Sequence, residues 1–442
     1  MVKVPPRERF CYTFCMGTRS TIFSAAITLL CFLLFSGCSE RKHPPEEAAR
    51  NVIVFKHGKI SGDPSIFRAI LDRFESENPG ISVREETLPA STDEQHQFYT
   101  LNLEGGTSDF DVLSMDVIWV PEFARAGWIR DLSHLASEQE RSDFFPGPME
   151  AVTYRGRMYA VPWYIDAGVL YYRKDLLDEY GFSPPRTWNG LVEAAQHITA
   201  QEKDLYGYIW QGKQYEGLVC NVLEFFWGNG GDVLKEDRLV IDSRENMEAA
   251  AFMRNLIESG ITPPLVTTAM EEPTRHIFGN GRALFMRNWP YVWNLYNAEG
   301  SPLRGRVGIA PLPSFPGKKP ISTLGGWQLG VNRFSRNPEA AEKLVRFLSS
   351  PDVQKTAALT IGYKPTRRSV YQDAELRAMQ PFIVSLHDIF MKARPRPVSP
   401  YYMMMTQVMQ PEFSAIISGI RSPEAALAST RRQIEHILEA DR

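Results

Sequence analysis

Aromatic side chains stand next to acidic, amide or basic side chains, and next to Gly or Pro, in several separate stretches of the sequence. These stretches are residues 115–119, 163–168, 211–217, 287–291 and 325–328. A solute with many hydroxyl groups needs this mixture, because hydroxyls donate and accept hydrogen bonds while C–H faces stack on flat rings. Charge-assisted bonds to Asp would fix the orientation of such a solute. The pattern therefore indicates a site for a sugar-like molecule.

Each of these residues also has a purely structural interpretation. Asp116 follows an apolar run, so its carboxylate could cap a helix. Asp166 precedes Ala-Gly and could shape a turn. Trp289 and Trp327 could belong to the core, since Trp is often highly buried, and Glu216 could be a solvated acid. The sequence leaves both interpretations open.

Several classes of function lack support in the sequence. The formal net charge is -3, and no basic stretch marks a nucleic-acid surface. There is no phosphate-binding loop, no Gly-x-Ser-x-Gly elbow and no His-Glu-x-x-His motif. A paired-carboxylate glycosidase built from Asp116 and Asp166 is an open but weaker alternative, because binding sites for sugars carry acids as well. We therefore expect a non-enzymatic protein without cofactor or metal.

The first 38 residues have the pattern of an export signal. A basic leader precedes the apolar run 22–35, which is short for a membrane-spanning helix, and the small residues Ser36 and Gly37 come before Cys38. Translation could start at Met1 or at Met16. The stretch resembles a bacterial lipoprotein signal, which implies lipidation of Cys38, secretion, and anchoring in the periplasm or at the cell surface. Residues 39–50 read as a polar tether.

The use of cysteine fits export without disulfides. Once the leader is removed and Cys38 carries lipid, Cys220 is the last thiol in the body, so no intramolecular disulfide and no cysteine-based zinc site can form.

The body alternates between strand and helix patterns. Apolar strands at 51–55, 81–83 and 111–115 flank a helix at 64–78, and this order predicts a parallel α/β sheet. The pattern restarts after about residue 161, and the chain is long for a single core. We expect two α/β lobes. The N-terminal lobe would comprise residues 51–161 and 328–365, and the C-terminal lobe residues 162–327 and 366–442.

Four stretches resemble extracellular solute-binding proteins of the carbohydrate-uptake class, above all the trehalose/maltose-binding proteins. They are residues 115–128, 163–177, 210–218 and 286–291, and the resemblance extends over the whole body. It implies the two-lobed periplasmic-binding-protein fold, with hinge crossings and a ligand cleft between the lobes. It also implies a monomer that delivers a small oligosaccharide to the permease of an ABC importer.

The resemblance assigns roles to individual residues. Asp116, Tyr164 and Asp166 would bind sugar hydroxyls. Gly326 would let the backbone approach the sugar, and Arg396 would reach the cleft unless it lies in a basic surface loop. The other implied cleft residues are the stacking rings Trp289, Trp327 and Tyr291, the acid Glu216, and Gln95 with His96 at the rim.

A second solute class stays open. The loop after the first strand carries Lys56 and Lys59, which is more basic than a neutral sugar requires. A polyol phosphate bound on the same fold is therefore an alternative, favoured if Lys56 or Lys59 points into the cleft beside Arg396.

Overall fold

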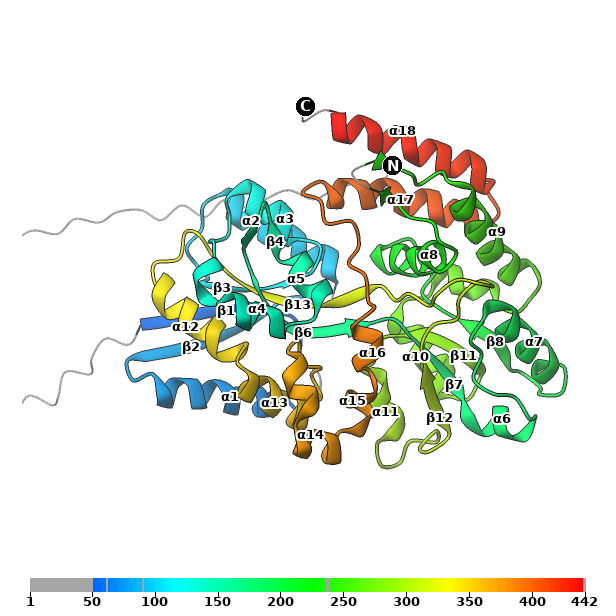
Figure 1. Ribbon diagram of the computed structural model, residues 1–442, viewed down its shortest axis with the longest axis horizontal. Coiled ribbons are helices and arrows are strands. Elements are labelled where there is room, and N and C mark those ends of the chain that lie inside the picture. Colours follow the sequence, from blue (N-terminus) through cyan, green and yellow to red (C-terminus); the bar gives the residue numbers. More distant parts are fainter. Residues whose placement is uncertain (1–50, 61–62, 90, 236–237, 440–442) are drawn as a thin grey trace, which may run out of the picture. The chain divides into compact units, whose positions relative to one another are not determined.

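The computed structural model describes residues 51–60, 63–89, 91–235 and 238–439 (Figure 1). The predicted signal (1–38), the lipidation site Cys38 and the tether (39–50) lie outside the described residues. Within the described part of the chain, no helix combines the length and the apolar character that crossing a membrane would require.

The first sheet has five strands in the order β2-β1-β3-β13-β6. Strand β1 is parallel to β2 and β3, as the order of strand, helix and strand predicts. Strand β13 inserts between β3 and β6 and is antiparallel to both, so the parallel arrangement predicted from the first three strands is confirmed for them, and the sheet as a whole is mixed. Local order along the chain predicts only the first three strands, because β13 arrives from far along the sequence. The strands are β1 (Asn51–His57), β2 (Ile81–Thr87), β3 (Val112–Asp116), β6 (Val161–Ala167) and β13 (Leu324–Val331).

Helix α1 (Pro64–Glu77) shows why the elements around this sheet form. The Asp63 side chain accepts a hydrogen bond from the Ser65 amide, and Pro64 occupies the first turn. Phe67, Leu71 and their helical neighbours Ile70 and Phe74 are buried. Other helices of this part are α2 (Thr92–Glu104), α3 (Val120–Ala126), α4 (Glu138–Asp143), α5 (Pro146–Ala151), α12 (Pro338–Leu348), α13 (Pro351–Thr360) and α14 (Ala374–Met379).

The second sheet has four strands in the order β12-β7-β11-β8, with β7 antiparallel to both neighbours and β11 parallel to β8. The strands are β7 (Val169–Arg173), β8 (Tyr206–Ile209), β11 (Ala283–Asn288) and β12 (Val307–Ala310). Helices α6 (Lys174–Glu179), α7 (Trp188–Thr199) and α10 (Glu271–Gly279) pack on these strands, and α11 (Val292–Asn297) follows β11. Helices α8 (Glu216–Gly228), α9 (Arg244–Glu258), α17 (Tyr402–Ile417) and α18 (Pro423–Glu439) form a helical layer on the same side of the protein in Figure 1.

Three chain segments connect the two sheets side by side. Gly168 alone separates β6 from β7, and its amide donates to the carbonyl of Thr323, just before β13. The Leu324 amide in turn donates to the carbonyl of Arg394, in the segment after α15 (Pro381–Ser385) and α16 (His387–Phe390). The predicted lobe boundaries at 161/162 and 327/328 fall within β6 and β13, and both strands pair in the five-stranded sheet. The division into lobes at these positions stays a prediction.

Candidate functional site

All ten residues that the sequence nominates for solute binding line one cleft of ≈ 880 Å³. They come from both sheets and from the connecting segments. They are Gln95 on α2, Asp116 at the end of β3, Tyr164 and Asp166 on β6, Glu216 at the start of α8, Trp289 and Tyr291 after β11, Gly326 and Trp327 on β13, and Arg396. The volume lies in the range of small-molecule sites.

The two indoles of the cleft are partly exposed and are not core residues. The edge of Trp327 meets the buried ring of Trp119, with centroids 5.8 Å apart and planes at 88°. The guanidinium of Arg287 lies over the Trp289 ring at 4.1 Å and covers that face. Tyr291 donates a hydrogen bond of 2.7 Å to Glu272. These contacts hold flat rings at the cleft surface, where they can stack on a solute.

A buried ion pair lies behind Trp289. Arg287 donates two hydrogen bonds, of 2.9 and 2.6 Å, to Glu224, and both side chains are almost fully enclosed. The backbone amide of Thr323 donates to the same carboxylate at 3.1 Å. The pair therefore links α8, β11 and the start of β13 at the junction of the two sheets. Sequence reasoning did not identify it, since the run around Glu224, residues 222–227, is otherwise apolar.

Arg396 connects acids from the two sides of the cleft. Its guanidinium donates to Asp116 and to Glu216, at 2.8 Å each, and the residue is only 3% exposed. The interpretation as a basic surface loop is therefore wrong. Glu216 is also buried, and it accepts hydrogen bonds from Tyr402 and Thr406, so it is not a solvated acid. Asp116 accepts from the Ile118 amide as well, and thus shapes a turn while it faces the cleft.

Asp166 and Lys364 are two titratable groups of the cleft whose charged forms are disfavoured by burial. Oδ1 of Asp166 is enclosed and has no hydrogen-bond partner among the described residues. Burial raises the pKa of Asp166 to about 6, although Lys364 and Arg287 act in the opposite direction. Burial lowers the pKa of the Lys364 ammonium, which the charge of Asp166 partly offsets.

Glycine lets two strands and a ring approach closely in the cleft. Gly326 has a φ of +106°, and a Cβ there would lie 2.3 Å from the Tyr164 carbonyl oxygen. A Cβ on Gly325 would lie 2.9 Å from the Trp289 ring. Trp289, from the second sheet, therefore rests directly on a strand of the first.

The rim partly differs from the sequence expectation. Gln95 lines the cleft, but His96 contacts Glu122 instead, with its Nε2 2.7 Å from a carboxylate oxygen. Lys56 pairs with Glu86, whereas Lys59 is exposed and lines the cleft. Acidic cleft residues outnumber basic ones. The acids are Asp63, Asp93, Asp116, Asp166, Glu216, Glu271 and Glu272, and the bases are Lys59, Lys364 and Arg396.

The cleft also contains residues that sequence reasoning missed. Tyr363 and Lys364 line it between Gly362 and Pro365, and the Tyr363 ring lies 4.1 Å from that of Tyr164. An aromatic and a charged residue between Gly and Pro match the signature used for the other stretches, so this pair could have been found. Tyr215, Glu271 and Glu272 line it as well.

Within the described ranges, no cluster of His, Cys, Asp and Glu is arranged to hold a metal ion. The buried thiol of Cys220 lines the cleft, and burial raises its pKa to about 12. This thiol therefore stays protonated and is a poor nucleophile at neutral pH.

Residues 58–355 match the family model described as "Bacterial extracellular solute-binding protein". A protein of Deinococcus radiodurans named "Probable ABC transporter-binding protein" is 38% identical over 368 residues, which cover 81% of this chain and 87% of that protein. The structure of maltose-bound MalE3 of T. maritima is 43% identical, with a TM-score of 0.81, over 87% of this chain and 99% of that one. A solute-binding protein of Thermotoga lettingae bound to α-D-tagatose is 27% identical, with a TM-score of 0.77, over 88% and 100%.

Proposed function

The chain belongs to the bacterial extracellular solute-binding proteins, and we propose that it binds a small neutral oligosaccharide of the maltose or trehalose kind for an ABC importer. The relative from D. radiodurans carries the name of an ABC transporter-binding protein, and MalE3 was solved with maltose. Both relatives are binding proteins rather than enzymes. In this role the chain captures the sugar outside the cytoplasm and presents it to the membrane permease as a monomer.

The observation that carries this proposal is the pairing of exposed rings with unsatisfied polar atoms. Oε1 of Gln95, Oδ1 of Asp166 and Nε of Arg396 are buried in the cleft without a hydrogen-bond partner among the described residues. Buried polar atoms normally find partners, so this set of acceptors and a donor favours a ligand that brings its own. Sugar hydroxyls supply both, and Trp289 and Trp327 offer faces for the C–H side of the rings.

The charge of the cleft favours a neutral solute over a phosphate. Lys56 is held by Glu86, and Arg396 lies between two carboxylates, so these cations are already neutralised. Lys59 is the exposed cation of the rim, and it shares the cleft with an excess of acids. A phosphate would meet more like charge than opposite charge there.

Isothermal calorimetry on the body of the chain, residues 39–442, tests this function. We expect maltose, maltotriose or trehalose to bind with a Kd of about 1 μM or tighter, which is about -8 kcal/mol. Sorbitol 6-phosphate tests the alternative solute class, and its selective binding would contradict a neutral oligosaccharide. Release of reducing ends during long incubation with maltotriose would instead indicate a glycosidase.

Lipidation of Cys38 is a separate part of the proposal. A single acyl chain gives weak membrane binding and several chains give stable anchoring, at about 0.8 kcal/mol for each buried methylene. Expression of the full chain in a bacterial host with a labelled fatty acid should label the protein, and Cys38→Ala should abolish the label. Equal labelling of both proteins would contradict this anchor.

A further inference from the structure

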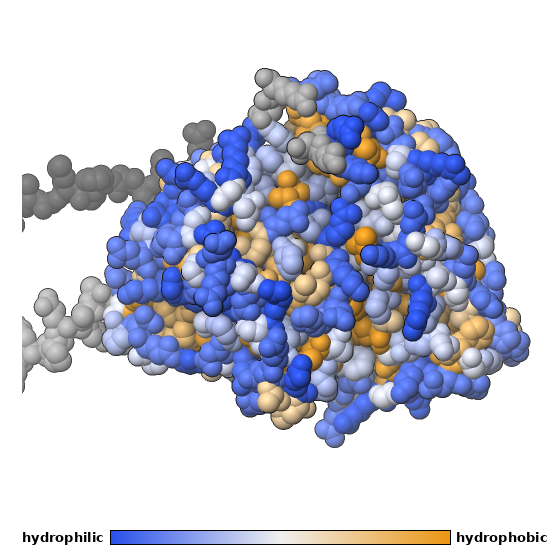
Figure 2. All heavy atoms as spheres, viewed as in Figure 1, coloured by the Kyte–Doolittle hydropathy of each residue, from blue (hydrophilic) through white to orange (hydrophobic). Residues whose placement is uncertain are grey.

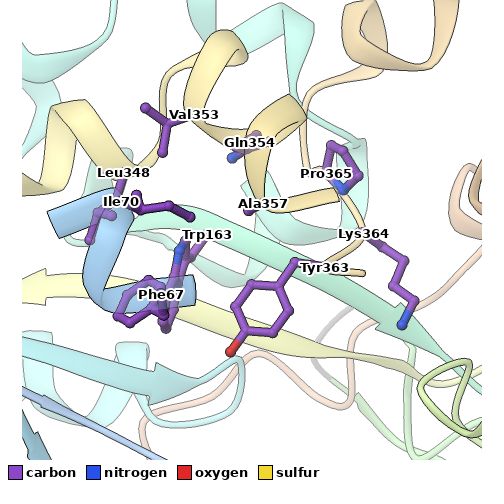
Figure 3. A pocket seen from close by; sticks show the side chains of 10 residues that line it. All are labelled: Phe67, Ile70, Trp163, Leu348, Val353, Gln354, Ala357, Tyr363, Lys364 and Pro365. Atoms are coloured by element: carbon purple, nitrogen blue, oxygen red, sulfur yellow. The ribbon is translucent and has the colours of Figure 1, made fainter. Parts of the chain in front are cut away.

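Lys364 is a largely buried lysine that lines the cleft. The residue is 5% exposed and follows Tyr363 in the segment after α13. Its backbone carbonyl accepts a hydrogen bond from the Ile165 amide, which fixes the segment against β6. A small apolar pocket lies on the other side of this segment, and Figure 3 shows the Lys364 side chain extending away from Phe67, Ile70 and the other residues that line it. The ammonium therefore points toward the large cleft and away from the apolar pocket.

The ammonium of Lys364 lacks a partner. Among the described residues it makes neither a hydrogen bond nor an ion pair, and Asp166 acts on it only as a more distant charge. Burial lowers the pKa of this ammonium, so its charged form is disfavoured by folding and costs stability in the empty protein. Asp166 lacks a hydrogen-bond donor in turn, since its enclosed Oδ1 has no partner. One group can only donate, and the ionised carboxylate can only accept.

Asp166 lies beside a stacking ring, and Lys364 is near enough for its charge to act on Asp166. Asp166 pairs with Gly325 across strands β6 and β13, so the two positions face the same side of the sheet. The Trp289 ring occupies the space where a Gly325 side chain would be. A sugar unit stacked on the ring face that Arg287 leaves free would therefore present its edge near the Asp166 carboxylate and the Lys364 ammonium.

We propose that Lys364 determines sugar specificity: its ammonium donates to an oxygen of the sugar unit stacked on Trp289, while a second hydroxyl of that unit donates to Asp166. This inference rests on the proposed function and adds a residue and a required pattern of hydroxyls to it. The two charges sum to zero, so the pair suits a neutral unit, and the carboxylate repels an acidic sugar. Each hydroxyl bonds to a charged group, and such bonds are the stronger kind.

A cycle of protein variants and ligand analogues tests the assignment. Calorimetry would compare maltose with its monodeoxy analogues on the wild type, Lys364→Met and Lys364→Arg at pH 8, where Asp166 is ionised. We expect Lys364→Met to lower maltose affinity about 10- to 100-fold, and Lys364→Arg to recover part of the loss. On the wild type, one deoxy analogue should bind at least about 10-fold more weakly than maltose. On Lys364→Met, the same analogue and maltose should bind with equal affinity.

Two further measurements separate binding from folding. Lys355→Met, on α13 and outside the cleft, removes a lysine held by Asp373 and Glu375 and should leave the affinity unchanged. The empty Lys364→Met protein should melt at a higher temperature than the wild type, because folding no longer removes water from a charged side chain. Full maltose affinity in Lys364→Met, or equal losses with every analogue, would overturn the role of Lys364 alone. A wild type that binds no sugar would overturn the proposed function itself.

Discussion

Replacing Asp166 by Asn should stabilise the empty protein while it weakens sugar binding. Burial raises the pKa of this carboxyl from 3.8 to about 6, and the nearby charges of Lys364 and Arg287 only partly counter the effect. Because the folded state disfavours the ionised carboxyl, this rise lowers the free energy of unfolding by about 3 kcal/mol above neutral pH. Asn keeps the shape of the side chain and removes the charge. The variant should therefore recover up to about 3 kcal/mol at pH 8.

The dependence on pH gives this prediction its sign. The folded state holds the Asp166 proton more tightly than the unfolded state does, because the folded pKa is the higher one. The stability provided by the protonated carboxyl is complete below about pH 3.8, and it is lost as the pH rises through about 6. The difference between Asp166→Asn and the wild type should thus be near zero at pH 3.5 and largest at pH 8.

Urea unfolding of both proteins between pH 3.5 and pH 8, with and without maltose, measures this difference. Asp388→Asn is the control, because that side chain is 88% exposed and should change stability little at any pH. With maltose the advantage of Asn should shrink, since Asn loses a charge-assisted bond and affinity should fall about 10- to 100-fold, which corresponds to about 1.4–2.7 kcal/mol. An Asp166→Asn protein no more stable than the wild type at pH 8 would refute the cost assigned to this buried carboxylate.

Three other outcomes follow from the contacts of the site. Trp289→Ala and Trp327→Ala should each weaken maltose binding by roughly 1–3 kcal/mol in calorimetry while the protein stays folded. The control is Trp293→Ala, which removes a ring stacked on Phe382 outside the cleft and should leave the affinity unchanged. Unfolding of either cleft variant would show that its ring belongs to the core. Glu224→Gln should cost about 3–5 kcal/mol in urea unfolding, because the buried guanidinium it pairs with loses its countercharge, and a loss below 1 kcal/mol would contradict that role. In protein lacking residues 1–38, Cys220 should react with Ellman's reagent only in urea, because the thiol is buried with a pKa of about 12, and rapid reaction of the native protein would show that the cleft exposes it.

The sequence predicted the general fold because local patterns carry that information. The α/β, two-lobed periplasmic-binding-protein fold is confirmed by the similarity to MalE3. The helix expected at 64–78 is α1 (Pro64–Glu77), since its apolar spacing and its caps are both local signals. The pairing of β13 with β3 and β6 carried no such signal, because the paired residues lie far apart along the chain, for example Trp327 with Asp116 and Leu324 with Ala167.

For the candidate site, too, local patterns could be predicted from the sequence and long-range contacts could not. Short stretches that combine rings, polar groups and Gly or Pro contain most of the nominated residues, and all ten line one cleft. Their roles in binding solute stay a prediction. The partners of these residues could not be predicted, since Arg396 meets Asp116 and Glu216 across separations of 280 and 180 residues. Lys364 was missed although its neighbours carry the same local signature.

The position of β13 sets a condition on biosynthesis. This strand lies between β3 and β6 in the first sheet and comes after all four strands of the second sheet in the sequence. A growing chain that ends before residue 324 lacks the partner that joins β3 to β6, so its first sheet stays open. The two sheets therefore become complete in the reverse of their order along the chain: the four strands of the second sheet are all made by residue 310, whereas the first sheet, begun at residue 51, has to wait for residue 331.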